Sequence, residues 1–288
     1  MNRREFLASG VAIAGAALAR FPFPLYASGT KKLASDRIRL GPMKVELSRM
    51  AMGTGTNGYA SSSNQTRRLG IRGLADLLQA AFDQGVTFWD SADAYGSHPH
   101  LKEALKRVPR DKVTILTKTR ASTEQQARAD LDRFRREIGT DYLDIVLLHL
   151  MEDDNWPQRK RGAMAAISEA REKGIVKTHG TSCHTLGALK AAAASPWVQV
   201  DLARINPARM AMDADPRTVV SVLRQMKSAG KGVIGMKILG AGGLSHRVDE
   251  ALQYALALDC VDCFTIGVEN RGQLQDLLRR IPAASTRG

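Results

Sequence analysis

The sequence is poor in cysteine and lacks an apolar run long enough to cross a bilayer. Its 288 residues contain three cysteines, Cys183, Cys260 and Cys263, which is too few for a disulfide framework. Cys260 and Cys263 form a single C-x-x-C without a second pair, and we interpret it as structural. The weakly apolar run from Phe6 to Ala19 is shorter than the ~20 residues of a membrane-spanning helix. We therefore expect no stable membrane anchor.

Acidic residues are outnumbered by basic ones, 29 against 42, which gives a formal net charge of +13. A basic surface suits nucleic acid, an anionic membrane or an acidic small molecule. Here the basic residues are scattered, as in Arg133, Arg135, Arg136 and Arg171, and no dense basic tract is interleaved with aromatic residues. We expect a solvated basic surface and no nucleic-acid partner.

Residues 1–29 have the pattern of a targeting segment. Arg3-Arg4-Glu5-Phe6-Leu7 resembles the twin-arginine export signal R-R-x-F-L. Ala17-Leu18-Ala19 fits an A-x-A cleavage site, with a later cut near Ala27 or Ser28 as the alternative. We expect export by the twin-arginine machinery to the periplasm or beyond, and a folded domain over residues 30–288. A buried helix that begins the domain is the competing interpretation.

Beyond residue 38, short apolar runs alternate with segments of helical spacing, and no linker or low-complexity insert interrupts them. Eight strands alternating with eight helices predict an α/β fold, a single (β/α)8 TIM barrel. A hairpin with a Gly-Pro turn is expected over 39–45. The strands are expected at 47–52, 88–90, 113–117, 143–148, 176–182, 198–205, 232–239 and 263–268, and the helices at 69–84, 101–107, from 122, and at 163–173, 186–194, 218–228, 248–258 and 273–280.

Ionisable residues stand where three successive strands end. The stretch 88–96 begins like a buried strand, turns polar and ends in glycine, and it carries Asp90 and Tyr95. The next two strands run into Lys118 and His149. A charged group at the carboxyl end of a barrel strand indicates chemistry rather than packing. An ammonium near a phenol lowers the phenol pKa, so Lys118, balanced by Asp90, can tune Tyr95 as a proton donor, while His149 orients a substrate oxygen.

In residue type, order and spacing, these four residues resemble the aldo/keto reductase family. That family carries D-[TS]-A-x-x-Y-G, then a lysine ending the third strand and a histidine ending the fourth. The resemblance covers roughly residues 38–281. It implies that the hairpin closes the bottom of the barrel. It also implies reduction of a small aldehyde or ketone with NADPH, or with NADH.

The resemblance further implies a coenzyme site at the carboxyl ends of the strands. Ser182 matches a residue that holds the nicotinamide amide, while Cys183, Leu202 and Met236 depart from the family pattern. Arg271 favours the 2′-phosphate of NADPH, and Glu269 opposes it. The residues expected to bind coenzyme are Gly53, Thr54, Ser182, Lys237, Leu239, Gly240, Gly243, Gly267, Asn270 and Arg271.

Two other functions stay open at this point. The three departures favour a barrel of this family that has lost activity and serves as a binding protein. The pair His98-Pro99-His100 is an H-x-H, which zinc hydrolases built on TIM barrels use. Lys118, His149, His179 or His184 would then complete the metal site.

Overall fold

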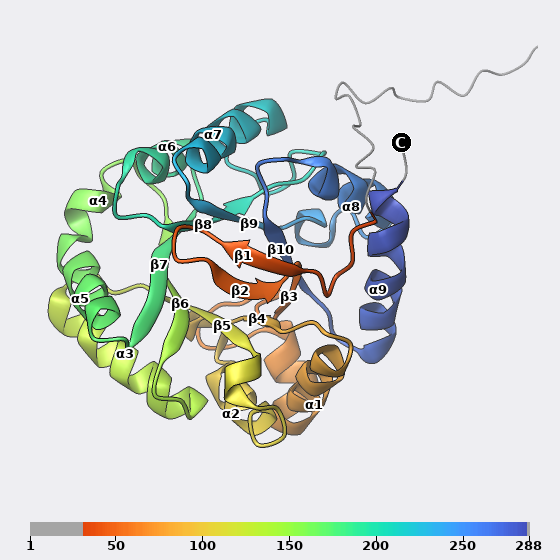
Figure 1. Ribbon diagram of the computed structural model, residues 1–288, viewed down its shortest axis with the longest axis horizontal. Helices are drawn as coiled ribbons and strands as arrows, with labels where there is room; N and C mark the ends of the chain where they lie inside the picture. Colours follow the sequence, from red (N-terminus) through yellow and green to blue (C-terminus); the bar gives the residue numbers. More distant parts are fainter. Residues whose placement is uncertain (1–30, 287–288) are drawn as a thin grey trace, which may run out of the picture.

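Eight parallel strands close into a barrel in the computed structural model, which describes residues 31–286 (Figure 1). The expected targeting segment, 1–29, lies outside the described residues. Around the barrel the strand order is β10-β3-β4-β5-β6-β7-β8-β9, which confirms the predicted (β/α)8 fold. The strands are β3 (Met50–Gly53), β4 (Phe88–Asp90), β5 (Thr114–Thr119), β6 (Leu143–Met151), β7 (Val176–Cys183), β8 (Val200–Arg204), β9 (Gly232–Met236) and β10 (Cys263–Gly267).

Helices surround the barrel and bury one apolar face each against it (Figure 1). In α3, Ala127, Leu131, Phe134 and Ile138 are all buried, as their helical spacing predicts. No helix in the described part of the chain combines the length and apolar character needed to cross a membrane. The helices are α1 (Asn64–Asp83), α2 (His98–Ala104), α3 (Glu124–Ile138), α4 (Trp156–Arg159), α5 (Arg161–Glu172), α6 (Leu186–Ala194), α7 (Pro216–Ser228), α8 (Val248–Ala257) and α9 (Arg271–Ser285).

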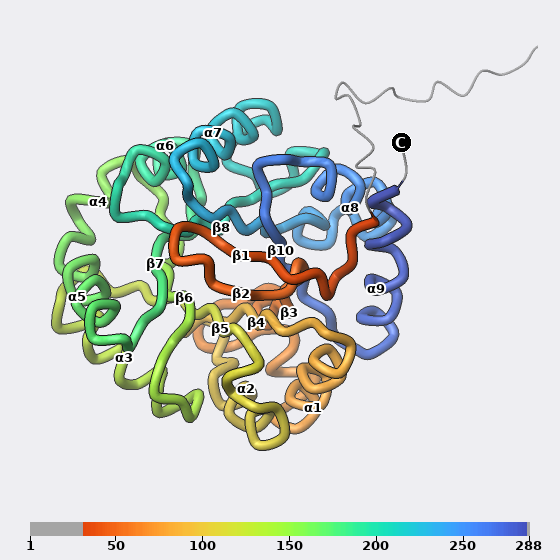
Figure 2. Tube along the Cα trace, viewed as in Figure 1, coloured from red at the N-terminus to blue at the C-terminus, as the bar shows by residue number. Residues whose placement is uncertain are grey.

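An N-terminal hairpin covers the end of the barrel from which the strands start (Figure 2). Its strands, β1 (Arg37–Leu40) and β2 (Val45–Ser48), are antiparallel, and Gly41 makes the turn with a φ of +62°, a conformation suited to glycine. Leu40 and Leu47 are buried in the cluster that fills the barrel. The hairpin therefore closes the bottom, as expected, and leaves the carboxyl end of the strands for chemistry.

Several predicted boundaries were wrong; for example, the helix expected at 101–107 is α2 (His98–Ala104), and the strand expected at 232–239 ends at Met236. The first barrel strand, expected at 47–52, begins at Met50, because Ser48 still pairs in the hairpin and its hydroxyl donates to the Met50 carbonyl at 2.7 Å. The first helix, expected from 69, is preceded by a helical stretch that begins at Asn64, where Ser63 and Thr66 form a reciprocal capping box, and Gly70 with a φ of +61° separates the two stretches. Between the strand expected at 143–148 and the helix expected at 163–173, residues 156–159 form α4.

The C-x-x-C pair lies at the closed end of the barrel, away from the carboxyl ends of the strands, as the sequence predicts. Cys263 opens β10, and both Cys260 and Cys263 are buried free thiols. Burial raises the pKa of Cys260 to about 11 and that of Cys263 well above its usual value. Thiols in this state are poor nucleophiles and poor metal ligands, which agrees with a structural role.

Candidate active site

A buried ion pair forms the base of the site. Asp90, the last residue of β4, and Lys118, on β5, both face the barrel interior, and the Lys118 ammonium donates to Asp90 Oδ1. The same ammonium donates to the Ser91 carbonyl at 2.8 Å. Asp90 Oδ2 accepts a hydrogen bond from the Thr265 hydroxyl of β10 at 2.9 Å. Lys118 is completely buried and Asp90 nearly so, so both charges depend on these partners.

Tyr95 is held over this pair by a short turn. The 3₁₀ turn η1 (Asp93–Tyr95) ends at Gly96, which adopts a φ of +62°. The turn brings the Tyr95 hydroxyl within 3.3 Å of Lys118 Nζ. The loop between β3 and α1 presses on the ring, and a Cβ at Gly55 or Gly58 would overlap it. Glycine at these two positions therefore allows the loop to cover the phenol. No pattern in the sequence marks this role for Gly58.

His149, in β6, completes the group. Its ring meets the Tyr95 ring edge-on, with 5.6 Å between centroids and an interplanar angle of 88°. The side chain is nearly buried, and its Nδ1 has no hydrogen-bond partner within residues 31–286. The structure thus brings together all four residues that the sequence singled out at the strand ends.

Burial and neighbouring charge set the protonation of these groups. Burial raises the pKa of Tyr95, and the charge of Lys118 only partly opposes this. Lys118 lowers the pKa of Tyr95, as expected from the sequence, but burial outweighs it and the net shift is upward. Burial is the largest influence on Lys118 and lowers its pKa, but attraction to Asp90 and Tyr95, together with the hydrogen bonds to them, outweighs burial and raises that pKa. Burial, with Lys118 and Arg120, holds the pKa of His149 well below its usual value. At neutral pH, Tyr95 is protonated, Lys118 charged and His149 neutral.

A chain of buried hydroxyls supports Asp90 from behind. The Thr54 hydroxyl donates to the Asp90 carbonyl at 2.9 Å and lies 2.8 Å from Ser97 Oγ. Ser97 Oγ in turn lies 2.7 Å from Ser91 Oγ. Thr54, expected at the coenzyme, therefore also fixes the strand end that carries Asp90. Ser91 and Ser97 were missed, because serines in a polar loop show no pattern that marks them as buried.

The residues considered for contact with the nicotinamide lie on two different faces of the barrel sheet. Ser182 Oγ accepts a hydrogen bond from the Leu150 amide at 3.1 Å and is buried. Leu202 and Met236 lie in the apolar cluster inside the barrel. Strand alternation turns Cys183 outward to the helix layer, where it packs in the larger core cluster and its thiol lies 3.5 Å from Asp201 Oδ1.

Asp201 is a completely buried carboxyl on β8. Its Oδ1 accepts a hydrogen bond from the Thr181 hydroxyl at 2.8 Å, while its Oδ2 has no partner in the described chain. Burial raises the pKa of Asp201 to about 7. The sequence did not single out this residue, because one aspartate within an apolar run has the pattern of a polar residue at the solvent-exposed end of a strand.

The loop after β9 carries the next group of expected coenzyme residues. Lys237 adopts a φ of +55°, and the Gly240 amide donates to its carbonyl at 2.8 Å. The Gly243 amide donates to the Gly240 carbonyl at 3.2 Å, and the Leu239 carbonyl accepts the Gly242 amide at 2.9 Å. These glycine amides thus already have partners in the loop. The half-buried Lys237 ammonium has no hydrogen-bond or ion-pair partner among residues 31–286, and burial lowers its pKa.

The strand ends β3 and β10 meet beside this loop. Gly53 and Gly267 are paired in register, and a Cβ at Gly267 would overlap the Thr56 hydroxyl. Asn270 caps α9 by accepting the Gln273 amide at 2.9 Å, and Arg271 beside it is exposed.

Glu269, the residue expected to oppose a 2′-phosphate, is compensated. Arg68 of α1 forms an ion pair with it, and Asn64 Nδ2 donates to its Oε1 at 2.8 Å. Lys237, Arg68 and Arg271 thus place cationic donors near the ends of β9 and β10, a set that suits the phosphates of a dinucleotide.

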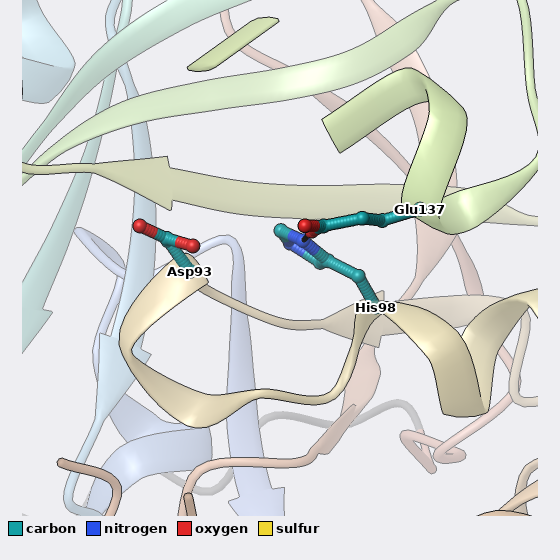
Figure 3. Close-up of side chains that lie close together, drawn as sticks. All are labelled: Asp93, His98 and Glu137. Carbon is teal, nitrogen blue, oxygen red and sulfur yellow. Dashed lines mark hydrogen bonds and ion pairs between the residues drawn. The ribbon is translucent and has the colours of Figure 1, made fainter. Parts of the chain in front are cut away.

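Two histidines considered for a hydrolytic metal site, His98 and His179, are engaged with other side chains. His98 binds Glu137 Oε2 through Nδ1 and Thr117 Oγ1 through Nε2, both at 2.8 Å. Figure 3 shows His98 pointing to Glu137, with Asp93 beside them. Arg133 pairs with Asp93 at 2.7 Å and with Glu137 at 3.2 Å, which supplies the positive charge there. His179 stacks on Trp197 instead, with centroids 4.4 Å apart.

Comparison with known proteins finds one family. The model of the aldo/keto reductase family matches residues 49–252. A D-threo-aldose 1-dehydrogenase of a Pseudomonas species is 24% identical over 222 residues, which cover 66% of each chain. The alignments thus span no more than about two thirds of the curated relatives. A Pseudomonas aeruginosa protein described as an aldo-keto reductase superposes with a TM-score of 0.73 at 18% identity, covering 88% of this chain and 97% of that one. A Bombyx mori aldo-keto reductase in complex with NADP gives 0.63 at 15% identity, with coverage of 87% and 92%.

The raised pKa of Asp201 predicts that the free energy of unfolding depends on pH. Its pKa is about 7 in the folded protein, against about 3.9 for a free aspartate. Between pH ~4 and ~7 the folded state keeps a proton on Asp201 that the unfolded chain has released. The contribution of Asp201 to the free energy of unfolding is therefore fully present below pH ~4 and is lost as the pH rises to ~7. Asp201→Asn mimics the protonated acid, and we expect it to stabilise the protein at pH 8 by up to about 4 kcal/mol, with a much smaller gain at pH 5. Denaturant unfolding at the two pH values measures this.

Asp144→Asn is the matched control. Asp144 is equally buried, but it pairs with Arg110 and Lys177, each at 2.7 Å. We expect that variant to be destabilised at both pH values. An Asp201→Asn gain that does not change with pH would refute the assignment.

Proposed function

Because the chain belongs to the aldo/keto reductase family, we propose that it is an oxidoreductase that reduces the carbonyl group of an aldehyde or ketone with NAD(P)H. The observation that carries this proposal is the convergence of Tyr95, Lys118 and His149 at the open end of the barrel, with Lys118 paired to Asp90. Carbonyl reduction needs a hydride, a proton and a group that polarises the oxygen. A bound nicotinamide coenzyme supplies the hydride.

Tyr95 is the proton donor. Burial keeps its phenol protonated through neutral pH, so the proton is available when a carbonyl oxygen gains negative charge. The phenolate left behind lies 3.3 Å from the Lys118 ammonium, which stabilises it in a site of low dielectric constant. Asp90 keeps Lys118 charged and in place. Lys118 therefore contributes most after the proton has left Tyr95.

His149 orients the carbonyl oxygen. Its imidazole is neutral because burial, Lys118 and Arg120 all disfavour the charged form. A neutral imidazole keeps one N–H that can donate to an oxygen, but it is a much weaker acid than an imidazolium. The division of roles, with Tyr95 giving the proton and His149 giving a hydrogen bond, follows from these two environments.

Cationic residues at the ends of β9 and β10 support a preference for NADPH. Lys237 and Arg271 are suited to the phosphates, and Gly53, Gly243 and Gly267 let the backbone approach closely. Compensation of Glu269 by Arg68 removes an obstacle to the 2′-phosphate. Ser182 and Asn270 complete the coenzyme site that we propose.

A binding protein that retains the barrel without turnover is the second candidate. It is favoured by the apolar residues Leu202 and Met236 inside the barrel, and by the Ser182 hydroxyl, which already bonds to Leu150. The intact arrangement of Asp90, Lys118, Tyr95 and His149 favours the reductase. Binding of a coenzyme separates the two candidates.

We also propose export through the twin-arginine machinery to the periplasm. The support is the pattern Arg3-Arg4-Glu5-Phe6-Leu7 followed by the weakly apolar run that ends at Ala19. Both features belong to the sequence alone.

Tyr95→Phe tests the assignment of the proton donor. The variant keeps the ring and its packing but cannot give a proton, so we expect turnover of para-nitrobenzaldehyde to fall at least ~100-fold. Coenzyme affinity should stay within a few-fold. Tyr142→Phe, at a tyrosine whose ring lies under Arg110, serves as the control and should keep parent turnover. Parent-rate turnover by Tyr95→Phe would exclude this mechanism.

Replacing Arg3 and Arg4 together by lysine tests export. We expect the parent chain in the periplasmic fraction of a Gram-negative host and the variant in the cytoplasm, because the signal requires the arginine pair. Arg20→Lys, outside the pair, should be exported like the parent. Equal distribution of the parent and the double variant between fractions would contradict the proposal.

A further inference from the structure

A cavity of about 300 Å³ lies beside the proposed catalytic group at the carboxyl end of β6. Its lining includes Arg120, His149, Met151, Glu152, Trp156 and Arg159. His149 lines the cavity and also contacts Tyr95, so the cavity borders the catalytic group at this residue. The volume is at the lower end of the roughly 300–1,000 Å³ found for small-molecule sites, which suits a compact ligand.

The lining of this cavity carries three cationic and two acidic side chains, most of them already engaged. Lys160 donates to the carbonyls of Arg120 and Ala121 at 2.8 and 3.1 Å. Arg159 forms an ion pair with Asp153. The remaining acid, Glu152, is exposed. Arg120 differs from the other cations: its guanidinium has no hydrogen-bond or ion-pair partner within the part of the chain that the structure describes.

Arg120 is close enough to act on the reacting groups. It follows Lys118 by two residues, where β5 ends. Its charge contributes to lowering the pKa of His149 and opposes the rise in the pKa of Tyr95. The nearest carboxylate of the catalytic group, Asp90, is fully used by Lys118 and Thr265. The positive charge of Arg120 at the cavity is therefore left for a ligand.

We propose that Arg120 binds a carboxylate of the substrate, so that the preferred substrates are small aldehydes or ketones that also carry a carboxylate. The inference rests on the proposed reductase function and deepens it. A guanidinium presents a planar fork that matches a carboxylate with two parallel hydrogen bonds. A substrate anchored in this way would place its carbonyl towards His149 and Tyr95, while Trp156 and Met151 provide apolar lining.

Arg120 stands apart from the cations that we assign to the coenzyme. Lys237 and Arg271 follow β9 and β10, whereas Arg120 follows β5, and the strand order places β3 and β4 between β5 and β10. Binding of a coenzyme phosphate by Arg120 is thus the less favoured use of its charge, and the experiment below distinguishes it.

The test uses para-carboxybenzaldehyde and its methyl ester, which differ in charge but share the same aldehyde. We expect the parent chain to show kcat/KM at least ~10-fold higher for the acid, the size of a charged hydrogen bond. Arg120→Gln should reduce this acid-to-ester ratio at least ~10-fold, mainly through KM for the acid, and Arg120→Lys should restore part of it. Arg136→Gln, which removes an exposed arginine of α3 outside the cavity, should leave the ratio within about twofold.

The results distinguish failure of the carboxylate-binding role of Arg120 from failure of the reductase function on which it rests. Reduction of both aldehydes with a ratio that Arg120→Gln does not change would overturn the inference and leave the reductase standing. Reduction of neither aldehyde by the parent chain would contradict the proposed function itself. A loss of NADPH affinity in Arg120→Gln as large as its loss of affinity for the acid would assign Arg120 to the coenzyme and overturn the inference.

Discussion

The ion pair between Asp90 and Lys118 is the interaction on which the site depends. A fully buried ammonium is costly unless its charge and all its donors are satisfied. Lys118 meets this condition through Asp90, the Ser91 carbonyl and the Tyr95 hydroxyl, and Asp90 through Thr265. These contacts join β4, β5 and β10. The same contacts that hold one side of the barrel together therefore also fix the position of the proton donor.

The two ends of the barrel differ in function because apolar side chains fill one end and charged side chains gather at the other. Leu40 and Leu47 of the hairpin seal the end where the strands start. The other end collects cations, including Lys118, Arg120 and Lys237, with fewer carboxylates to balance them. The charges of Lys118 and Arg120, added to burial, keep His149 neutral, while burial keeps Tyr95 protonated. The neutral phenol and the neutral imidazole thus both follow from burial, which the positive charge reinforces at His149 and opposes at Tyr95.

The sequence predicted the parts of this site that follow from local pattern. A buried strand followed by an ionisable residue marked Asp90, Lys118 and His149, because strand ends in a parallel barrel meet at one edge. The hydroxyl chain of Thr54, Ser97 and Ser91 could not be predicted in this way, because it depends on a contact between loops more than 40 residues apart in sequence. The net direction of the Tyr95 pKa was also missed.

The net shift of the Tyr95 pKa also depends on a contact between distant loops, because Gly55 and Gly58 cover the Tyr95 ring and bury it. Compensation of Glu269 by Arg68 is likewise a contact between two distant helical ends. Charges and hydroxyls near the ends of elements acquire their roles only once the chain has folded, whereas the barrel itself could be predicted from periodicity.

The most direct test of the reductase assignment is titration of the purified protein with NADPH and with NADH, followed by tryptophan fluorescence. The arrangement of Lys237, Arg271 and the compensated Glu269 predicts saturable binding of both coenzymes, tighter for NADPH. Absence of binding by either coenzyme would contradict the reductase assignment. It would give decisive weight to Leu202 and Met236 in the barrel and indicate a protein that binds another ligand.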